Sequence, residues 1–572
     1  MRLTLFLILL TPILSIAQSS NRISPQELSL MPSYIQQAAL WNHAGTIQPP
    51  ETPVRASAEW EEIDALMIAW TGYSTILSQI AHAAQTETKV IIICSDSNAV
   101  KNTLTSNGVP FTNINYLIAP FNSIWCRDYG QWNIYRQDVD SLALIDWTYN
   151  RPRPKDDTVP SSIMNYTGLP MYETTTAPND LIHTGGNFMC DGFGTGFSSK
   201  LIINENPSKT EAQIDTIMNR FMGINRYIKM DVLPYDGIHH IDMHMKLIDE
   251  ETILMGEYPA GIADGPQIEA NLQYVLANYN SVFGTPYKVV RIPMPPDASN
   301  LYPNNSNADY RTFTNSVFVN KTIILPFYET QFDTTATRIY EEALPGYKVV
   351  GIDCNSIIPS LGAIHCITKE VASRNPLLIS HQPLHDTYNT TLPYTVTARI
   401  QHASGIQQAY IYFTTDTAQP WQSVSMNNTG GYNWLGDIPA QTGGSTIYYY
   451  IEAQSVSGKT QVRPMPAPSG FWKFNVLLNS GIKNTASIKI NFTGSFPNPS
   501  HGITCIPVVT PDNTEISISL KNVLGQIVIP VFNGINNGEK KYFMNTSSTA
   551  PGVYLLEMLT KESRYSQTII VR

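Results

Sequence analysis

Three short clusters in the first two thirds of the chain contain side chains that could do chemistry together. A cysteine thiolate is a strong nucleophile, and a histidine from elsewhere in the chain commonly assists it. Aspartate carboxylates accept the forked N–H donors of a planar guanidinium. The set therefore suits nucleophilic attack on a bound cation. The clusters are Trp125-Cys126-Arg127-Asp128-Tyr129-Gly130, Gly237-Ile238-His239-His240-Ile241-Asp242-Met243-His244 and Gly362-Ala363-Ile364-His365-Cys366.

Each cluster by itself also has a plainer interpretation. The two-residue spacing of His240 and Asp242 predicts one face of a strand. Together with His244, the same residues could instead bind a metal ion. A lone cysteine such as Cys366 is more often a structural core residue. The neighbouring charges of Arg127 and Asp128 could form a structural salt bridge.

The elements that must position these clusters follow a recurring pattern. An amphipathic helix followed by a β-branched strand appears several times, and three of these strands are expected to begin at Tyr227, Tyr287 and Tyr347. A spacing of about 60 residues suggests an internal repeat. Residues 243–258 and 315–329 each read as strand, polar turn and strand. We therefore expect an α/β domain with five copies of this unit around a central site, with an open doubly wound sheet as the alternative.

The remainder of the chain predicts further domains. After about Pro383 the helical pattern ends, and alternating strands predict an immunoglobulin-like β-sandwich over residues 379–480. Short strands and turns predict a third, all-β module over residues 490–572. Residues 1–17 resemble a signal peptide, with a short apolar run before a small-residue cleavage site. Residues 18–53 are polar and are expected to be an N-terminal arm or pro-segment, which leaves 54–378 for the catalytic domain.

Composition narrows the class of protein. A chain of 572 residues is too long for one core, and 42% hydrophobic residues are typical of globular domains. The net charge of -10, with no basic cluster, argues against nucleic acid or an anionic membrane as the main partner. The six cysteines are scattered, so most are expected to be buried thiols rather than a disulfide framework or a zinc site. No later apolar stretch is long enough to cross a membrane.

Taken together, the motifs resemble a known family. W-x-R-D-x-G, H-x-D and G-x-x-H-C occur in the order typical of the guanidine-modifying superfamily, and a fourth shared motif begins at Gly185-Gly186-Asn187. The likeness covers about Ala58 to Val371. It is strongest to agmatine deiminases and to the peptidylarginine deiminases that bacteria secrete. It implies a five-bladed, pseudo-symmetric α/β-propeller, a pentein-like fold.

The end of the chain resembles the C-terminal sorting domain of the type IX secretion system. The likeness rests on the Pro497-Asn498-Pro499 opening, the turn at Leu524-Gly525-Gln526 and the Val571-Arg572 ending. A second ordinary sandwich is the alternative. The resemblance implies export through the periplasm, with the type IX machinery as a partner, and a secreted or surface-attached product.

Family resemblance also implies a role for individual residues. Cys366 would be the nucleophile and His240 the general acid and base, while Asp128 and Asp242 would hold the guanidinium. Asn315 matches the active-site asparagine of the family, and Trp125 would pack against the substrate. This chemistry requires no cofactor and no metal. These roles are carried by Cys366, His240, Asp128, Asp242, Asn315 and Trp125.

One segment discriminates between possible substrates. Arg151 and Arg153 resemble the paired arginines with which secreted peptidylarginine deiminases hold a peptide's C-terminal carboxylate, a task that suits the planar guanidinium. Agmatine has no carboxylate. We therefore expect peptides with a C-terminal arginine as substrates. The alternatives are an exported agmatine or free-arginine deiminase, an inert basic loop at this place, and an inactive surface adhesion protein.

Overall fold

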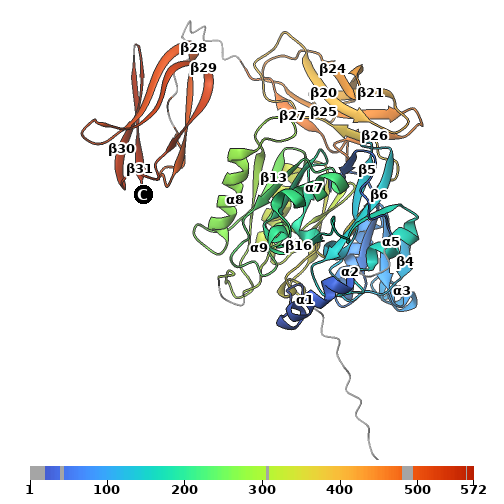
Figure 1. The fold of residues 1–572 in the computed structure, drawn as a ribbon. Coiled ribbons are helices and arrows are strands. Elements are labelled where there is room, and N and C mark those ends of the chain that lie inside the picture. Colours follow the sequence, from blue (N-terminus) through green and yellow to red (C-terminus); the bar gives the residue numbers. More distant parts are fainter. Residues whose placement is uncertain (1–19, 39–43, 305–307, 479–491, 493, 562) are drawn as a thin grey trace, which may run out of the picture. The chain divides into compact units, whose positions relative to one another are not determined.

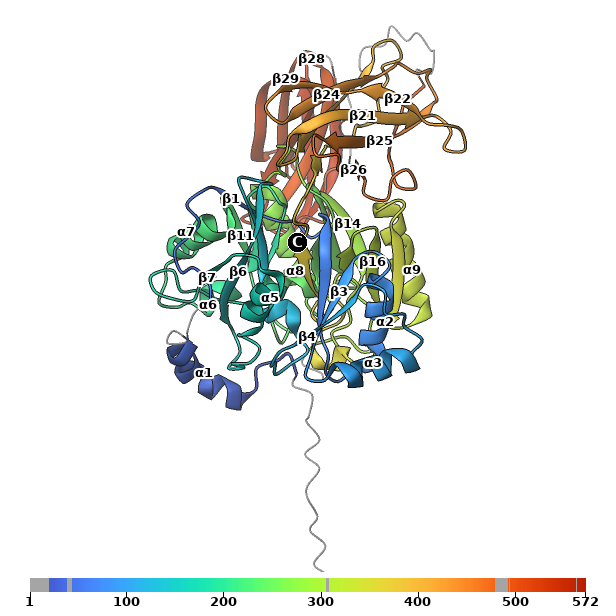
Figure 2. The same ribbon diagram turned by 90° about the vertical axis from the view of Figure 1, so that its right-hand side faces the viewer.

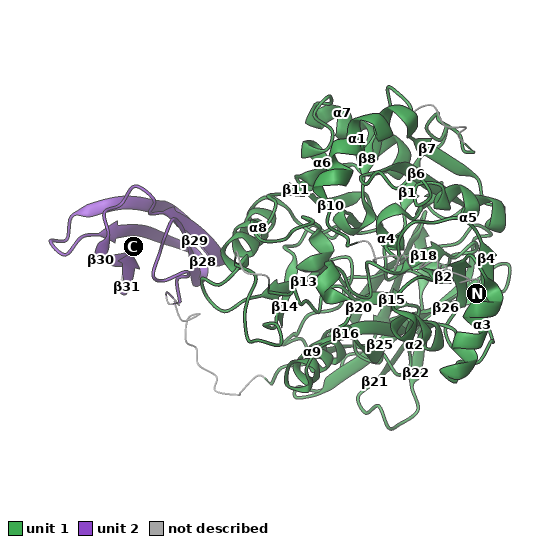
Figure 3. Cartoon of the chain, turned by 90° about the horizontal axis from the view of Figure 1, so that it is seen from below, with its two compact units in different colours: residues 1–478 green, residues 479–572 purple. Residues whose placement is uncertain are grey.

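The computed structural model describes residues 20–38, 44–304, 308–478, 492, 494–561 and 563–572. The predicted signal peptide, residues 1–17, lies outside them. Contacts divide the chain into two compact units, residues 1–478 and 479–572 (Figure 3). Unit 1 contains the α/β region and a two-sheet β region, and unit 2 is all β.

The helices of unit 1 begin and end as follows: α1 (Pro25–Ala38), α2 (Ser74–Ala84), α3 (Ser97–Ser106), α4 (Cys126–Tyr129), α5 (Val159–Thr167), α6 (Leu201–Asn204), α7 (Glu211–Met222), α8 (Gly265–Asn278) and α9 (Thr330–Ala343), with short 3-10 turns η1 (Gly185–Asn187), η2 (Ile241–Met243) and η3 (Ile358–Ser360). The strands of the α/β region are β1 (Val54–Ala56), β2 (Ile63–Ala69), β3 (Lys89–Cys94), β4 (Ile114–Ile118), β5 (Trp132–Arg136), β6 (Ser141–Tyr149), β7 (Met171–Thr174), β8 (Ile182–His183), β9 (Met189–Cys190), β10 (Thr195–Ser199), β11 (Arg226–Met230), β12 (Met245–Leu247), β13 (Thr252–Glu257), β14 (Lys288–Pro293), β15 (Val317–Val319), β16 (Thr322–Phe327), β17 (Lys348–Asp353) and β18 (Lys369–Ala372).

One strand arrangement recurs in five sheets of this described region. In each sheet a central strand pairs antiparallel with one neighbour and parallel with another, and at least one helix connects the two parallel strands. The central strands are β2, β6, β10, β13 and β16. Parallel neighbours need such a crossover, and the helix covers the strands with its apolar face. The two predicted hairpins are confirmed as β12–β13 and β15–β16.

The ends of the α/β region meet in one sheet. β18, the last strand of the region, pairs antiparallel with β2, the second strand along the chain. The strands predicted to begin at Tyr227, Tyr287 and Tyr347 are β11, β14 and β17, and each begins within one residue of the expected position. Along the chain, the motif segments fall in α4, η1, η2 and the turn before β18, which connect strands of these sheets.

Helix α7 illustrates how the sequence fixes the ends of these helices. The Thr210 side chain accepts a hydrogen bond from the backbone N–H of Gln213, and Gln213 Oε1 accepts one from the backbone N–H of Thr210. This reciprocal capping box satisfies donors that the first helical turn leaves free. Gly223 ends the helix with φ 70, a left-handed conformation that glycine adopts at little cost.

Two antiparallel sheets follow the α/β region within unit 1, at the end of the unit away from α1 (Figures 1 and 2). Their facing sides bury an apolar core that includes Val396, Ile411 and Phe474. Unit 2 is a four-stranded antiparallel sheet with its own core around Ile518 and Leu556. The strands are β19 (Leu378–Ser380), β20 (Tyr394–Gln401), β21 (Ile406–Thr414), β22 (Gln422–Ser425), β23 (Asn427–Gly430), β24 (Asn433–Ile438), β25 (Thr446–Ser455), β26 (Thr460–Arg463) and β27 (Trp472–Asn475) in unit 1, and β28 (Ile503–Lys521), β29 (Ile527–Asn545), β30 (Gly552–Thr560) and β31 (Arg564–Val571) in unit 2.

The predicted N-terminal arm is more ordered than its polar composition suggested. Residues 25–38 form the helix α1, and Thr46 pairs with Tyr172 at the edge of the sheet that contains β7. The arm therefore has two parts, a helical segment and a strap joined to a sheet.

The capping box of α7 gives a test of this local account. Thr210→Ala is expected to lower the free energy of unfolding by about 1 kcal/mol, because it leaves a backbone donor without its cap. Thr216→Ala is the matched control, since Thr216 is exposed in the middle of the same helix. Chemical denaturation of both variants measures the difference, and equal effects would contradict the capping role.

Candidate active site

The predicted thiol, imidazole and carboxylates come together in one buried place. Cys366 Sγ lies 3.6 Å from Asp242 Oδ2, and His240 Nδ1 lies 3.5 Å from Asp128 Oδ1. All four side chains have an exposed fraction of 0%. They come from α4, from η2 with the residue before it, and from the turn before β18. Residues separated by more than 200 positions thus share one site.

The expectation that His240 and Asp242 lie on a strand is wrong. Asp242 belongs to the 3-10 turn η2, and His240 is its N-terminal cap residue. The reason lies in the residue before them, since His239 has φ 59, a left-handed conformation that an extended strand does not contain. A tight turn brings both side chains to the site where a strand was expected to do so.

Gly186, from the fourth motif, lies between the charged groups. A Cβ atom at this position would lie 2.5 Å from His240 Nδ1 and 2.8 Å from Asp128 Oδ1. Its backbone N–H donates a hydrogen bond of 3.1 Å to Asp128 Oδ1. A glycine is therefore needed here because any side chain would occupy the space between the imidazole and the carboxylate.

Asn315 fixes the segment that carries the thiol. Its Oδ1 accepts hydrogen bonds from the backbone N–H groups of Ala363 and His365, at 3.1 and 3.0 Å. Its Nδ2 donates to Cys366 Sγ at 3.2 Å. The asparagine predicted from the family pattern is thus in direct contact with the thiol.

Trp125 forms a wall beside the thiol. The ring and Cys366 are packed so closely around Gly362 that a Cβ there would lie 2.5 Å from Trp125 Cζ3 and 3.1 Å from Cys366 Sγ. Both Trp125 and Cys366 are fully buried. The glycine of the G-x-x-H-C motif is explained by this contact.

A line of buried charges supports Asp242 from behind. His365 Nδ1 lies 2.7 Å from Asp242 Oδ2, and His365 Nε2 lies 2.7 Å from Glu59 Oε1. Lys246 Nζ donates to Glu59 Oε2 at 2.6 Å. His365 therefore lies between two carboxylates, one at each of its ring nitrogens. The motifs assign no role to His365, and both Glu59 and Lys246 lie outside the three clusters.

Arg127 pairs with residues of this buried network and not with its neighbour Asp128. Its guanidinium forms an ion pair with Glu370, with Nη2 2.8 Å from Oε2, and its Nε donates to the backbone carbonyl of His365 at 3.3 Å. Its backbone N–H donates to the Cys366 carbonyl at 3.1 Å. Arg127 therefore does form a structural salt bridge, but its partner is Glu370 of β18 and not Asp128.

Burial and charge set the protonation of the site. Burial, followed by the charges of Asp242 and Asp128, raises the pKa of Cys366 well above its usual value. Burial lowers the pKa of His240 even though Asp128 and Asp242 oppose this shift. Burial alone would raise the pKa of Asp242, but the hydrogen bond and charge of His365 outweigh it and lower that pKa. These shifts favour a neutral thiol beside an ionised carboxylate.

Two carboxylate oxygens at the site have no hydrogen-bond partner among the described residues. They are Asp128 Oδ2 and Asp242 Oδ1. A buried charge without a partner is costly, so these oxygens favour the entry of a cation that donates N–H groups. A guanidinium meets this requirement because its donors are planar and forked.

Arg151 and Arg153 do not join this cluster directly. Both are buried, and both contact residues of the N-terminal segment rather than a solvent-filled space. The charge of Arg151 still contributes to lowering the pKa of His240, after the larger effect of burial. The predicted arginine pair therefore lies near the site, at its edge.

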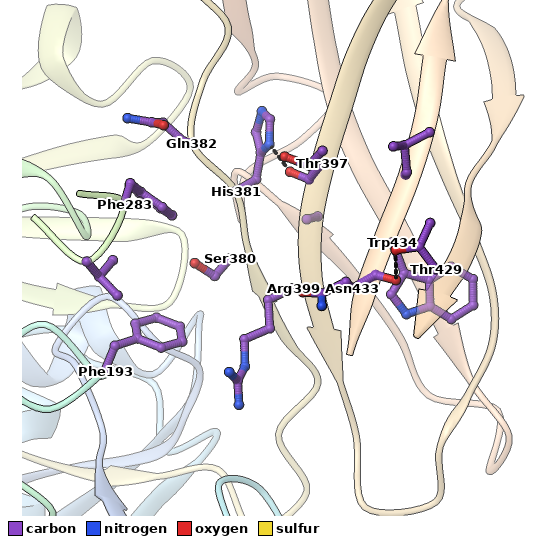
Figure 4. Close-up of a pocket in the computed structure, with 13 residues that line it drawn as sticks. Phe193, Phe283, Ser380, His381, Gln382, Thr397, Arg399, Thr429, Asn433 and Trp434 are labelled. Carbon is purple, nitrogen blue, oxygen red and sulfur yellow. Dashed lines mark hydrogen bonds between the residues drawn. The ribbon is translucent and has the colours of Figure 1, made fainter. Parts of the chain in front are cut away.

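A separate cavity of about 520 Å³ lies between the α/β region and the β sheets that follow it (Figure 4). Phe193, Phe283 and Arg399 are among its lining residues, and none of the clustered side chains is. For the metal alternative, the described residues contain no group of three or more His, Cys, Asp or Glu side chains arranged to hold an ion. All six cysteines are buried and none forms a disulfide.

Two models of known protein families match this chain. The model of the Porphyromonas-type peptidyl-arginine deiminase family matches residues 55–371, and that of the secretion system C-terminal sorting domain matches residues 495–572. The sorting domain indicates export by type IX secretion, to a secreted or surface-attached state. Within the described part of the chain, every helix is too short or too polar to span a bilayer.

Individual relatives agree with this placement. A Legionella pneumophila protein named “Putative agmatine deiminase” is 25% identical over 283 residues, which are 46% of this chain and 77% of that protein. A Vibrio parahaemolyticus protein of the same name is 22% identical, over 55% of this chain and 95% of its own. A solved agmatine deiminase of Enterococcus faecalis has a TM-score of 0.50 at 18% identity, and covers 58% of this chain and 100% of its own. The last likeness indicates the fold alone.

The buried charges behind Asp242 give a stability test. Glu59→Gln is expected to lower the free energy of unfolding by about 3–5 kcal/mol, because it leaves Lys246 and His365 without their shared carboxylate. Glu257→Gln is the control, since Glu257 is exposed at the end of β13. Denaturant titration measures both variants, and a loss below about 1 kcal/mol for Glu59→Gln would contradict the account.

Proposed function

We propose that this chain, which belongs to the Porphyromonas-type peptidyl-arginine deiminase family, converts peptidyl-arginine into peptidyl-citrulline and ammonia. C-terminal arginine is the proposed preference. The observation that carries the proposal is the pair of unpartnered buried oxygens on Asp128 and Asp242 beside the Cys366 thiol. The site has the geometry for a flat cation with a nucleophile at its edge.

In the proposed first half-reaction, the two carboxylates orient the guanidinium and the thiolate of Cys366 attacks its central carbon. The pKa of Cys366 is raised mainly by burial and then by the two aspartates, so an arriving cation favours the thiolate. As the carbon–nitrogen bond breaks, His240 passes the proton that it took from the Cys366 thiol to the departing amine, which leaves as ammonia. A covalent thiouronium on Cys366 remains.

In the second half-reaction, His240 takes a proton from a water molecule, and the resulting hydroxide attacks the thiouronium carbon. The carbon–sulfur bond then breaks as the proton of the new hydroxyl group passes to the sulfur, which releases the ureido group of citrulline and restores the thiol. Overall, one water is consumed and one ammonia is released for each guanidinium. Asn315 holds the sulfur in place, and Trp125 walls the pocket beside it.

For the fold, we propose that the five sheets are the blades of a five-bladed pseudo-symmetric α/β-propeller. The repeated strand order and the pairing of β18 with β2 support this proposal. We also propose that residues 379–480 form an immunoglobulin-like sandwich, on the strength of their two packed antiparallel sheets.

Agmatine deimination is the second candidate, because the relatives named above carry that name. The two candidates share the catalytic residues and differ at the edge of the site. A pair of arginines there favours a substrate with a carboxylate and disfavours the free amine of agmatine.

A substrate panel tests the proposed reaction. We expect the highest kcat/KM for a peptide ending in arginine, less for one with internal arginine and least for agmatine, measured as citrulline-type product and as a mass gain of about one dalton. Cys366→Ala is the control and should abolish turnover. Agmatine as the best substrate, or turnover that survives Cys366→Ala, would contradict the proposal.

A second test concerns the arginine pair. Arg151→Ala and Arg153→Ala should each raise KM for the C-terminal arginine peptide by about tenfold or more, because a charge-assisted contact of about 1.5–3 kcal/mol is lost. Their KM for agmatine should not rise, which serves as an internal control. Unchanged KM for the peptide in both variants would rule out the carboxylate clamp.

A further inference from the structure

The candidate active site is closed. Trp125, Asp128, His240, Asp242, Asn315 and Cys366 each have an exposed fraction of 0%. A substrate therefore cannot reach the thiol while the described residues stay in place. Something at the edge of the site must move before a peptide can enter.

The covering element includes the start of the N-terminal segment. Asn21 is fully buried, its backbone N–H donates to the Ser360 carbonyl at 2.9 Å, and its Nδ2 donates to the Leu361 carbonyl at 3.3 Å. Leu361 directly precedes Gly362, the residue packed against Trp125 and the thiol. Asn21 is thus attached to the turn that leads to the nucleophile.

Arg22 extends the same cover to a second side of the site. Its guanidinium packs against Gly237, so closely that a Cβ on Gly237 would overlap it. Gly237 lies three residues before His240, on the loop that leads to η2. The two consecutive residues Asn21 and Arg22 therefore contact both loops that deliver the proposed nucleophile and acid-base group.

The arginine pair forms the third side, and the segment occupies it. Arg151 donates from Nε and Nη2 to the Asn21 carbonyl, at 3.2 and 3.1 Å. Arg153 donates from Nη2 to the Ser20 carbonyl at 2.8 Å, and its Nε lies 2.8 Å from Glu27 Oε1. Two backbone carbonyls and one carboxylate thereby bind the groups proposed to hold a substrate.

The segment is built to make these contacts. Ser24 and Glu27 exchange hydrogen bonds between side chain and backbone, a capping box at the start of α1. The cap holds the Glu27 carboxylate beside Arg153. Farther along α1, Tyr34 and Ala38 are buried at 5% and 3% exposure. This helix lies at the end of unit 1 away from the sandwich sheets (Figure 1).

We propose that Arg151, Arg153 and the carbonyls of Ser360 and Leu361 form a peptide-binding site, and that residues 20–27 occupy it as an intramolecular ligand that keeps the site closed. The ligand class is a peptide that presents backbone carbonyls and N–H groups together with one carboxylate. The proposal deepens the proposed function, because it supposes that substrate peptides compete for the same groups. Such competition lowers the apparent affinity of the protein for a substrate peptide, because only the fraction of chains with an open site can bind it.

A charge reversal in the full chain tests the closure. Glu27→Arg places a cation against Arg153 and removes the capping acceptor, while Gln26→Arg adds the same charge one residue away. We expect iodoacetamide to alkylate Cys366 about tenfold faster or more in Glu27→Arg, as measured by peptide mass spectrometry, since breaking the contact shifts the closed state toward the open one. Gln26→Arg should match the unaltered chain. Equal rates in all three proteins would overturn the proposal.

A second arm covers the case in which Glu27→Arg does not fold. A full chain that lacks residues 20–38 should be alkylated at least as fast, and a synthetic peptide of residues 20–38 should slow that alkylation again. The same peptide with Glu27→Arg should be at least about tenfold weaker. Failure of the deletion to accelerate alkylation, or equal potency of the two peptides, would also overturn the proposal.

The alkylation rate separates this inference from the proposed function. It requires access to the thiol but no turnover. Faster alkylation without any citrulline product would support the closure and contradict the deiminase proposal. Citrulline formation with an unchanged alkylation rate in both variants would support the deiminase proposal and contradict the closure.

Discussion

The site depends on carboxylates that stay ionised while fully removed from water. Burial alone would raise the pKa of Asp242, but the hydrogen bond and charge of His365 lower it, and Glu59 lies at the other ring nitrogen of His365. Lys246 then balances Glu59. Removing two charges from water costs several kcal/mol, and only such alternation of sign offsets it. The remaining negative charge on Asp128 and Asp242 is what makes the pocket complementary to a cation.

This electrostatic balance also explains how a weakly acidic thiol suits the site. Burial and the two aspartates raise the pKa of Cys366, which favours the neutral thiol at this position. A guanidinium would reverse the local field at the moment it is bound. The Cys366 thiol would therefore be activated only when a cation binds. In addition, the N-terminal segment would have to move before a substrate could reach the thiol.

The edge of the site has a different physical character from its centre. Its groups are backbone carbonyls and arginine side chains, which bind peptide backbone and carboxylate without regard to a particular side chain. Glu27 already pairs with Arg153 as a peptide carboxylate would. Under the proposed function, the centre of the site would bind the guanidinium of an arginine and the edge would bind the chain of a peptide.

The sequence by itself predicted the candidate site residues and the recurring helix and strand unit. Short motifs indicated Cys366, His240, Asp128 and Asp242 because the proposed chemistry requires those residue types. Hydrophobic periodicity predicted where the strands of three repeats begin to within one residue. The spacing of Ser24 and Glu27 is that of a capping box and could have predicted the start of α1, but the polar composition of the segment favoured an irregular arm. Only the tertiary structure decided that Lys246 and His365 share the Glu59 carboxylate, that Gly186 leaves room between His240 and Asp128, and that Asn21 bonds to the turn before Gly362. Those are contacts between residues far apart in the chain, and local sequence patterns do not encode which distant groups meet in space.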